Sequence, residues 1–249
     1  MSFDEMIALS IPMIFFLFLV AEWLIGGGRS FPKVRFWTLI GVAGFIVTFA
    51  LSAVLPALIV PWLSPIRVLD LSAWGIWAAL PALVLTTFFT YWTHRIQHRF
   101  DILWRAGHQL HHGVARIDVA SSMIFHPIDL AVQFTATVLA ASLLGVTAQA
   151  AGIAGVGGFF IGVFQHWNVR TPQWIGYLIQ RPESHCLHHE RDVHARNFGD
   201  LPVWDMIFGT FLNPKAVDVA VGFEPERARR VLAMICCVDV NRAEARAKL

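Results

Sequence analysis

The sequence predicts an all-α fold: a polytopic helical membrane protein with a cytoplasmic helical cap that carries a histidine cluster. Composition is the first indication, because 56% of the 249 residues are hydrophobic and only 14% are charged, whereas typical soluble domains carry about 25% charged residues. The second indication is a set of apolar stretches, each near the length that crosses a bilayer. The third is the position of the histidines, which gather in polar segments between or after these stretches.

Residues 1–92 are predicted to form an N-terminal transmembrane region with about three spans. The first apolar stretch covers residues 7–25, the second residues 36–60 and the third residues 71–92. Each is close to the roughly 20 apolar residues that a helix needs to cross the hydrocarbon core of a membrane. Glycines follow the first stretch, and Pro61 and Pro65 mark the loop after the second.

Residues 93–214 are predicted to carry the functional site and to include an apolar hairpin at about residues 128–166. The hairpin comprises apolar stretches at residues 128–146 and 150–164. Because the second stretch is short for a span, the pair is expected to form either a full two-span hairpin or a tighter, partly re-entrant one. Residues 215–249 are predicted to form a C-terminal cytoplasmic tail.

The distribution of positive charge predicts the orientation in the membrane. Arg29 and Lys33 follow the first span, and Arg95 opens the arginine-rich segment after the third. Lys and Arg concentrate on the cytoplasmic side of membrane proteins, so the histidine motifs and the C-terminus are expected in the cytoplasm. The same topology brings His126 and His166, which flank the hairpin, to that face.

Three histidine motifs are the strongest chemical signal in the chain. The first is an HxxxH motif, His94 and His98. The second and third are HxxHH motifs: His108, His111 and His112, then His185, His188 and His189. Residues three and four apart share a helix face, and neutral imidazole is the commonest protein metal ligand. One HxxxH alone is more often an ordinary helix surface. Eight imidazoles in three motifs exceed the four ligands of a structural zinc and favour two metals with open positions.

Several other chemistries fit the sequence less well. A zinc protease of the HExxH type needs a glutamate after its first histidine, and that position here is Arg95. A metal transporter would place ionisable groups near the bilayer midplane, whereas Glu22 and Asp129 lie near span ends. No clustered basic stripe indicates nucleic-acid binding. A redox metal pair that activates oxygen against an apolar substrate fits both ligand number and membrane location, although imidazole alone does not choose between iron, zinc, copper and nickel.

Acidic residues flank the third motif. Glu183 and Glu190 have two readings: carboxylates that orient imidazole rings through the second ring nitrogen, or solvated loop charges.

The order and spacing of several short motifs carry a resemblance to a known family. They are HRIQH at residues 94–98, HQLHH at 108–112, FHP at 125–127, QHWN at 165–168, RPESHCLHHE at 181–190, NFG at 197–199 and WDMIFGTF at 204–211. Together they resemble the fatty acid hydroxylase/sterol desaturase superfamily of membrane histidine-box di-iron oxygenases. The resemblance covers roughly half of the chain.

The resemblance implies two Fe ions, with zinc possible on overexpression, and O2-dependent hydroxylation or desaturation of a lipid or sterol-like substrate. It implies metal ligation by the eight motif histidines, with His166 and, less directly, His126 completing the set. Asn168 and Asn197 would be polar residues near the site, or else a helix cap and a turn residue. Because the sequence carries no haem electron-transfer segment, electrons are expected from a separate reductase, ferredoxin or cytochrome.

Two positions depart from many relatives: Asp118 replaces an asparagine and Ile124 a basic residue. Both departures concern recognition of the substrate headgroup rather than the metal site. The alternative function is a non-catalytic or zinc-binding membrane metalloprotein with the same fold.

Overall fold

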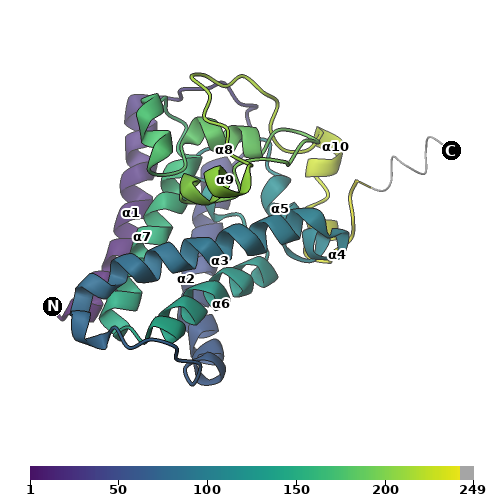
Figure 1. Cartoon of the computed structure of the whole chain (residues 1–249). Helices are drawn as coiled ribbons and strands as arrows, with labels where there is room; N and C mark the ends of the chain where they lie inside the picture. Colours follow the sequence, from purple (N-terminus) through teal and green to yellow (C-terminus); the bar gives the residue numbers. More distant parts are fainter. Residues whose placement is uncertain (242–249) are drawn as a thin grey trace.

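The computed structural model describes residues 1–241 and is built from helices (Figure 1), which confirms the predicted all-α class. Part of the predicted C-terminal tail, residues 242–249, lies outside the described residues. Within the described chain no segment forms a β-strand, and a single isolated bridge joins Glu190 to Val221.

Five helical segments are long and apolar enough to cross a membrane, as predicted. They are α1 (Phe3–Ile25), α2 (Trp37–Leu63), the short helix η1 (Ser72–Ala78) continued by α3 (Ala79–Arg99), α6 (Pro127–Leu144) and α7 (Ala148–His166). Only 6% of the most apolar window of α1, and likewise of α2, is buried inside the protein. Large apolar side chains of both helices are exposed, among them Leu17, Trp23 and Ile46, which is stable in lipid but not in water. The chain is therefore a polytopic membrane protein.

The spans pack in two pairs that α3 crosses. α1 lies beside α7 and α2 beside α6, while α3 packs against both α6 and α7 (Figure 1). Phe15 of α1 stacks on Phe45 of α2 with ring centroids 4.5 Å apart, and both join a buried cluster with Val163 of α7. At Gly41 a side chain would collide with Ala120, so glycine lets α2 approach the cap closely.

The apolar hairpin consists of two full-length helices rather than a tight pair. α6 and α7 are joined by a short turn at Gly145, whose φ of 57° favours glycine, and Thr147 caps α7 through the backbone N–H of Ala150. Beyond this turn the helices diverge, because α6 packs mainly on α2 and α3 whereas α7 packs on α1 and α3.

Short helices form a cap at the end of the membrane bundle where α3 and α7 finish. They are α4 (Asp101–Leu103), the π-helical turn η2 (Trp104–His108), α5 (Gln109–His112), η3 (Ser121–Met123), η4 (Gln173–Tyr177), α8 (Pro182–His188), α9 (Pro202–Phe208), α10 (Pro225–Ala228) and α11 (Val231–Ile235).

The segment predicted as a tail from residue 215 packs on this cap over its described part. Phe223, Met234 and Val240 are buried in one cluster with Leu110 of α5. The Gln109 side chain donates a hydrogen bond to the carbonyl of Val238 at 2.8 Å. Residues 215–241 therefore contribute to the core that supports α5.

Candidate metal centre

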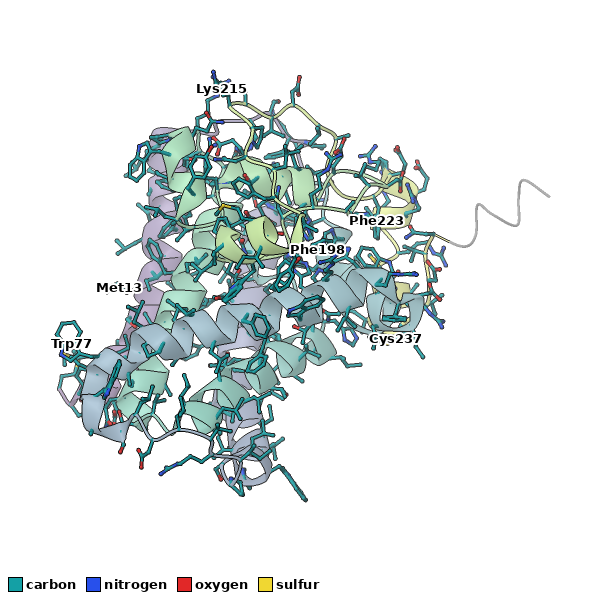
Figure 2. All side chains as sticks on the ribbon, viewed as in Figure 1. Met13, Trp77, Phe198, Lys215, Phe223 and Cys237 are labelled. Carbon is teal, nitrogen blue, oxygen red and sulfur yellow. The ribbon has the colours of Figure 1, made fainter. Side chains whose placement is uncertain are left out.

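The first motif lies on the last two turns of α3, where the helix leaves the membrane bundle and enters the cap. His94 and His98 are four residues apart and point to the same side. The Nδ1 atom of His94 lies 2.7 Å from the carbonyl oxygen of Phe198, which fixes its ring. Phe198 lies where α3 meets the cap (Figure 2).

The second motif follows a π-helical turn. In η2 the backbone N–H of Gln109 bonds the carbonyl of Trp104, a five-residue step that is frequent at functional sites. His108 and His112 point toward the motif on α3. His111 points elsewhere, toward His166 at the end of α7, with ring centroids 5.1 Å apart.

The third motif divides in the reciprocal way. His185 and His189 lie with His111 and His166, whereas His188 lies with the histidines of α3. Each HxxHH motif thus gives its i, i+4 pair to one group and its third histidine to the other. We define group one as His94, His98, His108, His112 and His188, and group two as His111, His166, His185 and His189.

The ligand nitrogens of each group converge on a small volume. Within a group one nitrogen per ring lies within 4.8 Å of all the others. In group one, the Nε2 atom of His112 is 3.1 Å from the Nε2 atoms of both His108 and His188. In group two, the Nε2 atom of His185 is 3.2 Å from that of His166 and 3.1 Å from that of His189.

The outer nitrogens of five rings face oxygen acceptors, which sets their tautomers. Four Nδ1 atoms face backbone carbonyls: His94 faces Phe198, His111 faces Ile124, His166 faces Gly162 and His188 faces Arg196. The fifth, Nδ1 of His108, faces a carboxylate oxygen of Asp129. A ring that donates through Nδ1–H carries a lone pair on Nε2. Lone pairs of His108 and His188 therefore point into group one, where the buried Nε2 atoms of His94 and His98 have no hydrogen-bond partner. Converging lone pairs repel one another unless a cation lies between them, so these residues fit a metal.

The number of imidazoles bears on coordination number. Group one has five, one more than the four ligands of a tetrahedral site. Group one therefore favours a cation that takes five or six ligands, whereas group two, with four imidazoles, suits a cation with four ligands or one that keeps open positions.

Burial keeps the cap histidines neutral. Loss of solvent, and then the neighbouring imidazoles, hold the pKa of His112, His185, His188 and His189 well below the usual value. For His111 the pKa is lowered in the same way, again chiefly by burial. Neutral imidazole is the form that binds a metal, so the site is ready for metal at neutral pH.

Asp129 is a contact that sequence reasoning missed. It is 1% exposed, accepts a hydrogen bond from His108 Nδ1 at 2.9 Å, and takes another from the Gln97 amide at 3.1 Å. The sequence reading placed Asp129 only near the end of a span. Its position two residues after the His-Pro pair, at the start of an apolar helix, was the available signal.

The structure does not bring His126 into either group. Its Nδ1 accepts a hydrogen bond from the backbone N–H of Ile128 and so caps α6, and its Nε2 lies 3.0 Å from the carbonyl oxygen of Ile235. Both ring nitrogens of His126 have protein partners, so this geometry favours an anchoring role at the start of α6 over the predicted place in a metal shell.

Neither carboxylate flanking the third motif orients a histidine through any recorded hydrogen bond. Glu183 bonds the backbone N–H and hydroxyl of Thr171 and pairs with the fully buried Arg181 at 3.1 Å. Glu190 lies in the backbone bridge to Val221, and its carboxylate has no recorded bond to an imidazole within residues 1–241. Among residues 1–241, no hydrogen bond supports the reading in which these carboxylates orient imidazole rings, and the buried Glu183 is not a solvated loop charge either.

The side chains of Asn168 and Asn197 both bond backbone groups of other segments. The Asn168 side chain exchanges two hydrogen bonds with the backbone of Arg29, each 2.9 Å long. Asn197 has a φ of 55°, donates to the carbonyl of Ser184 and accepts from the N–H of Leu212. The turn reading therefore fits Asn197, whereas the side chain of Asn168 joins two segments that are far apart in the sequence.

His194 packs beside group one without joining it. Its ring centroid is 4.8 Å from that of His112 and 5.1 Å from that of Trp104, and burial lowers its pKa to about 4. It lies outside both groups of converging nitrogens.

Fold and site together define a membrane protein with two adjacent all-imidazole groups, at the end of its spans, that could hold metal. The sequence model of the fatty acid hydroxylase family matches residues 79–210, from the start of α3 to just beyond the cap helix α9. The chain belongs to this family, which confirms the resemblance seen in its motifs. Proteins of this family use iron, in keeping with histidine groups that can hold metal.

Curated relatives are lipid oxygenases. An ornithine lipid hydroxylase of Rhizobium tropici is 32% identical over 159 residues, which is 61% of this chain and 47% of that protein. Alkylglycerol monooxygenases of Homo sapiens and Xenopus tropicalis are 27% and 26% identical, over 61% and 62% of this chain and 32% of each relative. The matched region therefore spans half or less of these relatives. No solved structure gives a significant match.

Proposed function

We propose that the protein is a di-iron oxygenase that uses O2 and external electrons to hydroxylate a membrane lipid with long alkyl chains. The observation that carries the proposal is the pair of buried all-imidazole groups where membrane helices enter the cap. Each group would hold one iron, with all members of groups one and two as ligands. Imidazole accepts several metals, so the choice of iron rests on family membership.

The names of the relatives support the substrate class. Ornithine lipid and alkylglycerol are both lipids, and both named activities are hydroxylations or monooxygenations. Hydroxylation is therefore favoured over the related desaturation. Inserting one oxygen atom into a C–H bond and reducing the other to water consumes two electrons and two protons. The proposal accordingly includes a separate electron donor of the reductase, ferredoxin or cytochrome class.

The residues of the site perform three tasks in this proposal. Bonds from the outer ring nitrogens to backbone carbonyls and Asp129 hold five of the nine imidazoles in place, so that these rings need little reorganisation when metal binds. Burial excludes water and keeps the rings unprotonated. When bound, a redox-active metal pair supplies the oxygen activation. Because the groups lie at the end of the spans, a lipid can reach them from the bilayer.

Isotope incorporation tests the proposal. Protein purified without metal is loaded anaerobically with ferrous iron, supplied with 18O2 and a chemical or ferredoxin-type electron donor, and offered an ornithine lipid and an alkylglycerol in nanodiscs. We expect about two irons per chain and one 18O atom in a lipid product detected by mass spectrometry. Zinc-loaded protein is the matched control and should form none.

The second candidate function, a non-catalytic or zinc-binding membrane metalloprotein, has a specific prediction. Iron-loaded protein would then incorporate no 18O into either lipid or into extracted host membrane lipids, with any of several electron donors. Zinc would also persist at full occupancy in protein expressed under iron-replete conditions. This combination would replace the oxygenase proposal.

A further inference from the structure

An apolar groove lies outside the histidine groups, between the membrane helices α3 and α6, which run side by side (Figure 1). Its volume is about 340 Å³, at the lower end of the roughly 300–1,000 Å³ typical of small-molecule sites. Phe89 and Thr93 of α3 line one wall. Ile128, Ala131, Thr135 and Leu139 are among the residues of α6 that line the other.

The threonines do not make the groove polar. The Thr93 hydroxyl donates to the carbonyls of Phe89 and Thr90, and the Thr135 hydroxyl donates to the carbonyl of Ala131. Both donors are satisfied within their own helices, so the side chains offer the groove mainly their methyl groups. A ligand here meets hydrocarbon and no hydrogen-bond donor from these threonines.

The groove opens toward the lipid and has the length of one leaflet. Thr135 and Ile128 are exposed on helices that span the membrane. From Ile128 to Leu139 the wall of α6 extends about 16 Å, close to half of the roughly 30 Å hydrocarbon thickness of a bilayer. One alkyl chain of a lipid in the leaflet nearest the cap matches that length, because each leaflet is one chain deep.

The cap end of the groove adjoins the histidine groups. Thr93 directly precedes His94, and Ile128 directly precedes Asp129, which holds the ring of His108. A chain lying in the groove would therefore approach the polar contacts of group one. We propose that this groove binds one alkyl chain of the lipid substrate and leads it toward the metal centre. The proposal rests on the proposed function and adds where the substrate lies.

Photo-crosslinking tests this site directly. The reagent is a 1-O-alkylglycerol with a 16-carbon chain and a diazirine at its middle, added to the metal-loaded protein in nanodiscs. We expect crosslinks at residues 89–93 and 128–139 that an excess of unmodified 1-O-hexadecylglycerol removes. Ala131→Phe, and Thr135→Phe as a second variant on the exposed wall, should lower this crosslinking about tenfold or more because a phenyl ring fills the space.

Ala141→Phe is the matched control, because Ala141 lies half-buried on the same helix and does not line the groove. It should crosslink like wild type, and all three variants should keep their metal content, which reports that the cap is folded. Crosslinks spread evenly over the lipid-facing surfaces of α1 and α2, insensitive to competitor and to Ala131→Phe and Thr135→Phe, would overturn the groove. Competed crosslinks in the groove without any 18O-labelled product would support the groove and count against the oxygenase proposal alone.

Discussion

At the scale of single residues, the site depends on which ring nitrogen of each histidine is occupied. His188 turns Nδ1 to the carbonyl of Arg196, at 2.7 Å, and Nε2 toward His112. His126 uses one nitrogen on a backbone N–H of α6 and faces a backbone carbonyl of α11 with the other. Two buried histidines of one chain are therefore predicted to have different functions.

We expect His188→Ala to abolish product formation and to lower the iron content by about one ion per chain. The reason is that group one loses one of its five imidazoles, the one whose Nε2 lies beside that of His112. His126→Asn should keep its iron, because asparagine also caps a helix and avoids the roughly 1 kcal/mol cost of losing a cap. Iron per chain and product formed are measured for both in the same membranes. Equal iron loss in both variants would contradict the assignment of His126, and full iron in His188→Ala would contradict the ligand role of His188.

Asp129 gives a second prediction at this scale. Asp129→Asn removes the negative charge that faces His108 and leaves one oxygen for two donors. Loss of such a carboxylate partner typically weakens metal affinity or activity by about 10–100-fold. Competition with a coloured chelator under anaerobic conditions measures the affinity for ferrous iron. Glu190→Gln is the control and should match wild type, since no bond to an imidazole is recorded for Glu190. Unchanged affinity in Asp129→Asn would exclude the orienting role.

At the scale of elements, Asp200 links the cap to two membrane helices. Its carboxylate accepts hydrogen bonds from Gln165 of α7 at 3.2 Å and from Thr90 of α3 at 3.4 Å. Burial raises the pKa of Asp200 to about 6, mainly through desolvation. The folded state therefore holds this proton more tightly than the unfolded chain does. Stability from this group falls as pH rises from its ordinary pKa to about 6 and then levels off.

This shift predicts a pH-dependent effect of Asp200→Asn. The uncharged amide removes the cost of a buried carboxylate, so the variant should lose less thermal stability than wild type between about pH 4 and pH 6. Thermal unfolding of both proteins in the same detergent, followed with a thiol-reactive dye, measures the difference. Parallel curves for the two proteins over this range would show that ionisation of Asp200 does not limit stability.

At the scale of the whole molecule, the orientation in the membrane stays a prediction from charge. Lys215 lies on the cap and Trp77 at the opposite end of the molecule (Figure 2). Both Lys215 and Arg196 are exposed, as is Val68 in the loop between α2 and η1. These positions let a membrane-impermeant reagent distinguish the two faces.

In a chain whose native cysteines are replaced by alanine, Lys215→Cys and Arg196→Cys should react with an impermeant maleimide only after the cells are opened. Val68→Cys should react in intact cells, because the opposite end of the bundle faces outside. Labelling is measured by the mass shift of the purified protein. Reaction of Lys215→Cys in intact cells would place the cap outside the cytoplasm.

The sequence by itself determined the fold class, because the length and apolarity of a membrane helix follow from bilayer thickness and hardly depend on its neighbours. It also identified the histidine motifs, since residues three and four apart must share a helix face.

Only the tertiary structure divided each HxxHH motif between two groups. Adjacent helical residues point about 100° apart, and which group each ring joins depends on the neighbouring helices. His111, for example, meets His166 from α7, while His112 meets His188 from α8. The partners of His126 and Asp129 were decided in the same way. The second ring nitrogen of His126 meets the carbonyl of Ile235 only when α11 packs on the cap, and a carboxylate can orient His108 only after α6 has docked against the cap.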